Sequence, residues 1–163
     1  MNTRREARET ALQALYQCDT LDDWSEDSIA LFFERFAPPM PEENALAKSV
    51  RLYSLNIIRG VRDNLKLIDR GITSVSQHWS LERMARVDRN LLRLAAYEMR
   101  FFPDVPYRVS LNEAIEIAKK FGNADSPRFV NGVLDKLAMQ IADDPSVSKH
   151  EQCQEGRKKA INA

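Results

Sequence analysis

The spacing of apolar residues constrains the fold of this 163-residue chain more than any other feature of its sequence. In the segment DSPRFVNGVLDKLAMQI, apolar side chains recur every three or four positions, at Val130, Val133, Leu134, Leu137 and Ile141. This is the period of one helix face that packs against a core. Strand signals are weak, because none of the five glycines lies in a hairpin setting between alternating apolar runs. The sequence therefore predicts an all-α chain.

The same spacing, together with the proline and glycine residues between apolar runs, predicts the other helices. We expect helices over about residues 3–19, 28–36, 43–69, 87–101, 110–122 and 126–141. The proline cluster PPMP is the strongest internal break, but it is too short to be a domain linker. We therefore predict one helical bundle domain of about seven helices in two subhelical groups over residues 1–143. A polar tail, expected to be flexible, follows over residues 144–163.

Local signals predict where these helices begin, bend and end. Ser110 and Glu113, in SLNE, have the spacing of a capping box. Gly122 is the expected left-handed terminator of that helix, and Gly60 is a candidate bend in the long 43–69 stretch. In DSP at 125–127, the first two residues are good caps and the proline suits the first helical position.

Signals for enzymatic chemistry are poor. The chain has no phosphate-binding glycine loop, no dinucleotide-binding fingerprint and no nucleophile elbow. His78 and His150 have no ligand-like neighbours at helical spacing, which favours surface or capping roles over metal binding. Cys18 and Cys153 are far apart in sequence and predict two free thiols. We therefore expect no catalytic site, no cofactor and no metal.

The sequence also lacks membrane and export signals. No apolar run approaches the roughly 20 residues of a membrane span. The amino terminus MNTRREARET has no apolar signal core. We therefore expect a cytoplasmic protein that does not associate with a membrane.

Charge is balanced over the chain but separated along it. Residues 19–43 carry eight acids and one base, whereas residues 48–86 carry eight bases and three acids. Separated charge can bind an anion on one side and a basic partner on another, or it can simply mark solvated helix faces. Glu98 lies toward an apolar stripe, where a carboxylate needs a hydrogen bond or a neutralising charge. A free backbone amide near Ser110 or a nearby arginine could supply this partner, so we expect a structural role for Glu98.

Two groups of residues point to anion or RNA binding. Arg4, Arg5 and Arg8 lie within roughly a 100° arc at the start of a helix. Cations there oppose the helix dipole, so a bound phosphate explains them better than helix stability does. A solubilising, frayed terminus is the alternative. Lys119 and Lys120 extend the candidate RNA-binding set, although cations at that helix end also suit the dipole.

The second group lies in DSPRF, off the centre of the apolar stripe. Phe129 can stack on an unpaired base, Arg128 can contact a phosphate and Asp125 can accept a hydrogen bond from a base edge. The alternative is that Phe129 closes the edge of the core and Asp125 only caps the helix. Spacing alone does not separate these two interpretations.

Three segments resemble the NusB family of transcription antitermination proteins. RREARETALQALYQ at 4–17 resembles the amino-terminal signature of the family, and RVDRNLLRLAAYEM at 86–99 resembles its central helix. DVPYRVSLNEAIEIAKKFGNADSPRFVNGVLDKLA at 104–138 resembles its carboxy-terminal signature. The resemblance covers most of residues 3–142, and the three segments occur in the correct order. Residues 20–50 and the tail beyond residue 143 do not match, so no role is transferred there.

The resemblance implies an all-α, non-enzymatic protein that binds boxA RNA in nascent ribosomal RNA leader transcripts together with the ribosomal protein NusE. Such proteins help to load an antitermination complex on RNA polymerase. By position, the RNA-binding role falls on Arg4, Arg5, Arg8, Asp125, Arg128 and Phe129. Tyr16 and Asp88 match positions at the NusE interface. Some members of the family are homodimers, and the sequence leaves the oligomeric state open.

Two other functions compete with this interpretation. A NusB-like domain also begins certain ribosomal RNA cytosine methyltransferases, but this chain has no glycine-rich cofactor loop. A purely protein-binding helical adaptor would instead turn the arginines and Phe129 toward a polypeptide. Such an adaptor would not prefer boxA RNA over a scrambled strand, and its binding to boxA would lack the steep salt dependence of an RNA-binding protein.

Overall fold

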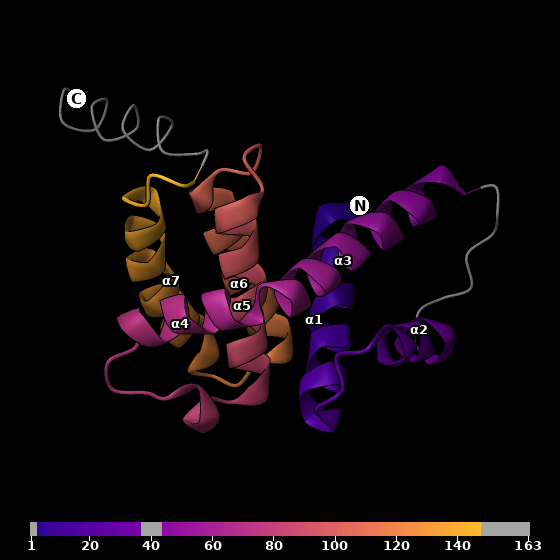
Figure 1. The fold of residues 1–163 in the computed structure, drawn as a ribbon, viewed down its shortest axis with the longest axis horizontal. Coiled ribbons are helices and arrows are strands. Elements are labelled where there is room, and N and C mark those ends of the chain that lie inside the picture. The colour runs from indigo at the N-terminus through magenta and orange to yellow at the C-terminus, as the bar shows by residue number, and fades with distance from the viewer. Residues whose placement is uncertain (1–2, 37–43, 148–163) are drawn as a thin grey trace.

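The computed structural model describes residues 3–36 and 44–147, and within these ranges the chain is all-α (Figure 1). It forms seven α-helices and one 3₁₀-helix, η1. Their bounds are α1 Thr3–Leu21, α2 Glu26–Arg35, α3 Ala45–Asp63, α4 Leu65–Val75, η1 Leu81–Arg83, α5 Arg86–Phe101, α6 Tyr107–Phe121 and α7 Ser126–Ala142. No strand occurs in the described ranges, so the predicted fold class is confirmed. None of the described helices is long and apolar enough to cross a membrane.

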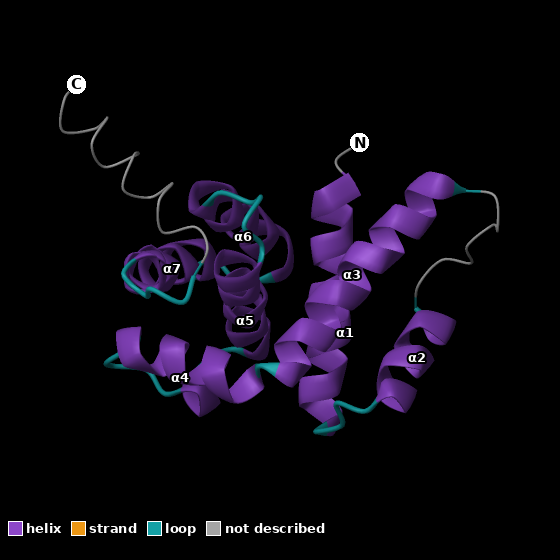
Figure 2. Cartoon of the chain, turned by 45° about the horizontal axis from the view of Figure 1, so that its top comes forward, coloured by secondary structure: helices purple, strands orange, loops and turns teal. Residues whose placement is uncertain are grey.

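The helices form two groups that meet at α5. Helices α1, α2 and α3 lie on one side of the molecule, and α4, α6 and α7 lie on the other (Figures 1 and 2). Helix α5 packs against members of both groups, namely α1, α3, α4, α6 and α7. Its residues from Asn90 to Met99 are all buried, which makes α5 the centre of the core. The expectation of two subhelical groups is therefore confirmed.

The long helix predicted over residues 43–69 is two helices, and the predicted bend at Gly60 is wrong. The break lies at Asn64, whose backbone N–H and side-chain amide both donate to the carbonyl oxygen of Gly60. Gly60 itself lies within α3. A Cβ atom there would come within 2.0 Å of the Tyr97 ring, so glycine permits the close packing of α3 on α5.

The capping box predicted at SLNE is also wrong. Helix α6 begins at Tyr107, directly after Pro106, so Ser110 is already inside the helix. Its hydroxyl is buried and finds no hydrogen-bond partner among the described residues. Glu113 does not reach back toward Ser110 but pairs with Arg5 of α1. Pro106 starts the helix earlier because a proline fixes φ and lacks the N–H that a helix start leaves unpaired.

The turn between α6 and α7 differs from its prediction in two ways. Gly122 has φ −92°, so it does not adopt the left-handed conformation. A Cβ atom there would lie 2.4 Å from Ser126 Oγ, so glycine is needed for close approach within the turn. Asp125 makes no capping hydrogen bond. The side chain of Asn123 instead accepts from the backbone N–H groups of Asp125 and Ser126, at 2.9 and 3.1 Å.

The bundle extends slightly past the boundary expected at residue 143. Arg100 donates to Asp144 at 2.8 Å, and Val147 is 4% exposed and packs on the core. The predicted proline break at 38–41, His150, Cys153 and most of the predicted tail lie outside the described residues. Cys18 is buried with a free thiol, as predicted.

Candidate RNA- and partner-binding surfaces

The start of α1 contains one buried and two more accessible arginines. Arg8 is only 3% exposed, and its Nε and Nη2 donate to the two carboxylate oxygens of Glu98 at 2.6 and 2.8 Å. The Tyr53 hydroxyl donates to the same carboxylate at 3.1 Å. Burial, followed by the negative charge of Glu98, raises the pKa of Tyr53. The expected structural role of Glu98 therefore holds, with Arg8 rather than an amide near Ser110 as its partner.

The other two arginines lie on the surface beside this buried pair. Arg5 donates to Glu113 of α6 at 2.7 and 3.0 Å, and its side chain is 39% exposed. The hydrogen bond from Arg5 to Glu113, and then the charge of that carboxylate, raise the pKa of Arg5. The guanidinium of Arg4 lies 4.1 Å from the centre of the Tyr53 ring, within range of a cation–π contact. The α1 arginines thus combine surface charge with contacts to the bundle.

Two lysines extend this basic surface along α6. Lys120 contacts Glu9 of α1 at 3.0 Å, and Lys119 contacts Glu116 at 2.8 Å. Both lysine side chains are more than half exposed, so these ion pairs open readily to a competing phosphate. The surface that contains Arg4, Arg5, Lys119 and Lys120 is called the basic strip below.

The start of α7 presents the second predicted group. Asp125 and Arg128 are exposed, and none of the described side chains pairs with Arg128. Phe129 is partly buried and packs against the edge of the core, and its role in base stacking stays a prediction. Its ring also contacts Trp79, with centroids 6.5 Å apart and planes at 76°. Sequence reasoning missed Trp79, because the residue lies in the loop after α4, 50 positions away.

The two predicted partner-binding residues differ in exposure. Tyr16 is 41% exposed on α1, so its ring is accessible to a partner. Asp88, in the first turn of α5, is only 6% exposed. Burial raises the pKa of Asp88, and a hydrogen bond with Ser126 at the start of α7 opposes this shift. Asp88 therefore lies beneath the α6–α7 turn rather than on an open surface.

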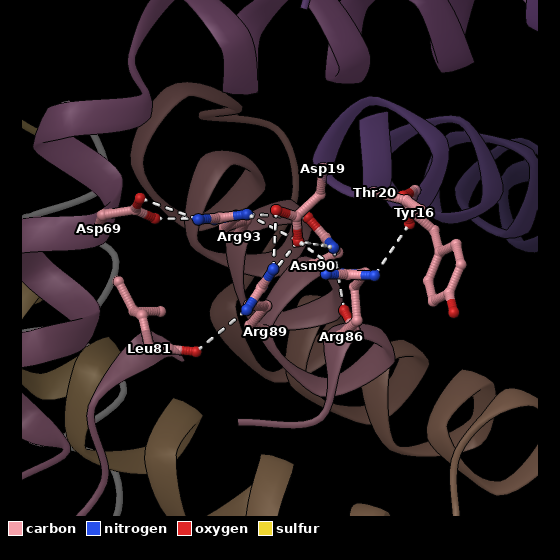
Figure 3. Close-up of polar contacts among 9 residues, drawn as sticks. All are labelled: Tyr16, Asp19, Thr20, Asp69, Leu81, Arg86, Arg89, Asn90 and Arg93. Atoms are coloured by element: carbon pink, nitrogen blue, oxygen red, sulfur yellow. Dashed lines mark hydrogen bonds and ion pairs between the residues drawn. The ribbon is translucent and has the colours of Figure 1, made fainter. Parts of the chain in front are cut away.

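A charged cluster next to Tyr16 joins the two helical groups (Figure 3). Asp19 of α1 accepts from Arg89 at 2.6 and 2.8 Å and from Asn90 at 2.8 Å. Arg93 lies 3.4 Å from Asp19 and also donates to Asp69 of α4, at 2.8 and 3.0 Å. Burial raises the pKa of Asp19, but the hydrogen bonds from Arg89 and Asn90 outweigh it and hold the pKa below its usual value. The sequence showed separated charge here, but it did not show that these acids and bases pair within the chain.

Other charges of the acidic and basic segments pair in the same way. Glu26 of α2 accepts from Arg59 at 3.0 and 3.1 Å and from Arg62 at 2.7 Å, both on α3. Part of the separated charge is thus paired between α2 and α3. Among residues 3–36 and 44–147, no group of three or more histidine, cysteine or acidic side chains is placed to hold a metal ion.

Comparison with known proteins gives a consistent result. The NusB family model matches residues 5–139. A transcription antitermination protein NusB from Citrifermentans bemidjiense is 46% identical over 145 residues, which covers 88% of this chain and 99% of the relative. A protein of the same name from Desulfatibacillum aliphaticivorans is 42% identical over 149 residues, with coverage of 91% and 99%.

Solved structures agree with these relatives. NusB from T. maritima is 37% identical and superposes with a TM-score of 0.69, over 84% of this chain and 91% of that chain. A crystal structure of antitermination factors NusB and NusE in complex with double-stranded RNA gives a TM-score of 0.71 over 86% and 98%. At 24% identity, the latter likeness supports the fold alone. The chain belongs to the NusB family, a family of non-enzymatic transcription antitermination proteins.

Proposed function

We propose that this protein binds single-stranded boxA RNA of ribosomal RNA leader transcripts together with the ribosomal protein NusE. It thereby assists assembly of an antitermination complex on RNA polymerase in the cytoplasm. The observation that carries the proposal is the first turn of α7, which follows a turn fixed by Asn123. Arg128 there is exposed and pairs with no side chain of residues 3–36 and 44–147, and Phe129 is partly buried. Membership of the NusB family supports the choice of partners. A solved structure of the same fold is a complex of NusB with NusE and double-stranded RNA.

Phosphate binding falls to the basic strip and to Arg128. Arg4, Lys119 and Lys120 are exposed, and the surface ion pairs of the two lysines cost little to break. Arg8 acts indirectly in this proposal, because its guanidinium is engaged by Glu98 and nearly inaccessible. It fixes α1 against α5 and so holds Arg4 and Arg5 at the surface.

Base recognition falls to Phe129 and Asp125. The exposed part of the Phe129 ring offers a surface for one unpaired base, and the exposed carboxylate of Asp125 can accept from a base amino group. NusE would contact the exposed ring of Tyr16 on α1, where the neighbouring Asp19 cluster fixes the helix surface. Asp88 contributes from beneath, through its contact with Ser126.

The test compares boxA RNA with a scrambled strand of equal length, with and without NusE, at two salt concentrations. We expect a preference for boxA and an affinity that falls steeply with salt, because bound cations displace counterions from the phosphates. Equal affinity for the two strands would contradict the proposal and favour a protein-binding adaptor. Sedimentation of the free protein and of the complex would establish whether a homodimer is involved.

Phe129→Ala tests the base contact within this proposal. We expect it to weaken boxA binding by roughly 1–3 kcal/mol, the range for one stacked base, with the fold retained. Leu65→Ala is the matched control, because Leu65 is also a partly buried apolar side chain packed on the core. Its stability loss should leave RNA affinity unchanged. Normal boxA binding by Phe129→Ala, or unfolding of that variant, would remove the stacking role.

A further inference from the structure

A hollow beside the proposed RNA surface has features that the function above does not use. It measures about 460 Å³ and lies between the loop after α4 and the first three turns of α7. Its lining includes Ser76, Trp79, Arg128, Phe129, Gly132 and Lys136. Trp79 is 53% exposed there, a large apolar surface to leave in water.

The two aromatic rings form adjacent walls of this hollow. Their planes meet at 76°, so they make an edge-to-face corner rather than a closed stack. The exposed indole of Trp79 therefore remains available to a flat ligand, with the Phe129 ring beside it. This arrangement suits a planar heteroaromatic group better than a flexible aliphatic chain.

Gly132 lies on the α7 side of the same hollow and is not explained by packing. A Cβ atom added there would meet nothing within 4 Å, in contrast to Gly60 and Gly122, where one would clash. Glycine in the middle of a helix is unfavourable relative to alanine. An open glycine at this place is explained if an occupant needs the space above it.

The charges at the hollow favour a nucleic acid as the source of the ligand. Arg128 and Lys136 are both exposed cations on α7, and Asp125 is the acid among the residues that line the hollow. The hollow shares Phe129, Arg128 and Asp125 with the proposed RNA surface. An RNA strand bound to that surface therefore passes the opening of the hollow. Cations beside aromatic rings are the usual combination for binding an unpaired base and its phosphate.

We propose that this hollow is a nucleobase pocket in which Trp79 stacks on an unpaired base of the bound RNA. The proposal rests on the RNA-binding function above and extends it to a second base contact. Trp79 supplies the stacking face, Phe129 the adjoining wall, and Arg128 and Lys136 hold the phosphates on either side.

Tryptophan fluorescence tests the pocket directly, because the chain has only two tryptophans, Trp24 and Trp79. Trp24 is partly buried, near the guanidinium of Arg93 at 5.8 Å. In Trp24→Phe, we expect boxA RNA to quench the emission of Trp79 and to protect it from acrylamide. In Trp79→Phe, the emission of Trp24 should not respond to RNA. Unchanged Trp79 emission at saturating RNA would overturn the proposal.

Substitutions at Gly132 test the pocket without removing any contact. Gly132→Leu places a side chain in the open space, whereas Gly132→Ala adds only one methyl group. We expect Gly132→Leu to weaken boxA binding about tenfold and Gly132→Ala to weaken it by a smaller factor. Both variants should fold, because the site is exposed and helical. Equal boxA affinity of the two variants would contradict the pocket.

A scan of boxA strands with one abasic position each identifies the base and separates the two proposals. One abasic position should weaken binding to the parent protein but not to Trp79→Ala, because the two changes remove the same contact. Additive losses at every position would overturn the pocket while leaving RNA binding intact. A parent protein that does not distinguish boxA from scrambled RNA would instead contradict the underlying function. Quenching of Trp79 by NusE alone would assign the hollow to a protein partner.

Discussion

The two helix starts that form the proposed RNA surface each lie above a buried carboxyl group, and the two carboxyl groups are treated differently. Beneath α1, Glu98 accepts two hydrogen bonds from Arg8 and one from Tyr53. Beneath the start of α7, the Asp88 carboxyl group forms a hydrogen bond with Ser126, but its Oδ1 has no hydrogen-bond partner among the described residues. Both carboxylate oxygens of Glu98 therefore have hydrogen-bond partners, whereas one oxygen of Asp88 has none among the described residues.

This difference indicates different roles for the two regions. The Arg8–Glu98 pair joins the first helix to the central helix, so it fixes where the basic strip lies. The α6–α7 turn depends on short local contacts from Asn123 and on a carboxyl group that burial penalises. We expect this turn to open locally at a lower free-energy cost than the contact between α1 and α5, as is common for segments that bind ligands. We therefore expect changes beneath α1 to act mainly on folding and changes near α7 to act mainly on binding.

The largest expected effect comes from breaking the pair beneath α1. Arg8→Met should lower the free energy of unfolding by about 3–5 kcal/mol, because it leaves the Glu98 carboxylate buried without a counter-charge. Urea unfolding followed by circular dichroism measures this change. Arg5→Met is the matched control on the same helix, and loss of its exposed pair with Glu113 should cost less than about 1 kcal/mol.

A double variant sharpens the interpretation of this result. Arg8→Met combined with Glu98→Leu removes both charges and should recover much of the stability, since apolar replacement of a buried pair is often nearly neutral. Equal effects of Arg8→Met and Arg5→Met would show that the buried pair is not the element that fixes α1. A double variant as unstable as Arg8→Met would show that packing, rather than charge, accounts for the loss.

Arg128, which no described side chain engages, and Arg5, which pairs with Glu113, should differ in their contribution to RNA binding. Arg128→Ala should weaken boxA binding about fivefold to tenfold and reduce the salt slope by about 0.7, the value for one phosphate contact on a single strand. Arg5→Ala should have a smaller effect, because Arg5 must first give up Glu113 to bind a phosphate. Titration at several salt concentrations measures both slopes. A larger slope change for Arg5→Ala would contradict the view that pairing within the chain limits its use.

The sequence predicted the helices well because apolar periodicity reports local structure directly. It placed Val130, Val133, Leu134, Leu137 and Ile141 in the core, and all five are buried. The predicted helix ends and bends were less reliable. Helix α6 begins after Pro106 rather than at the predicted capping box in SLNE. Gly60 permits packing against Tyr97 and does not bend its helix. These outcomes depend on which residue of another helix lies opposite, and spacing along one helix does not contain that information.

The same limit applies to the candidate site. The arc of arginines in TRREAR was visible in the sequence, but the burial of Arg8 depends on Glu98, 90 positions away. Trp79 could not be assigned to the site, because its link to Phe129 exists only once α4 and α7 have packed. The pairing of Asp19 with Arg89 and Arg93 was hidden for the same reason. The resemblance to NusB proteins supplied candidate positions, and the structure distinguished exposed side chains from engaged ones.

The smallest expected effect concerns the incompletely satisfied carboxyl group beneath α7. Because the pKa of Asp88 is raised in the folded protein, the folded state binds its proton more tightly than the unfolded state, whose pKa is near 3.8. Its contribution to stability is therefore most favourable at low pH and is lost as the pH rises from 3.8 through the raised folded-state value. Asp88→Asn should then be more stable than the parent at neutral pH, by roughly 1 kcal/mol, since it removes a charge from an incompletely satisfied buried site. Thermal unfolding of both proteins from pH 3 to pH 8 measures this gain, which should shrink toward low pH as the parent carboxyl group becomes protonated. A gain that is constant over this range would show that the ionisation of Asp88 is not its cause, and a loss at neutral pH would show that the charge itself holds the start of α7.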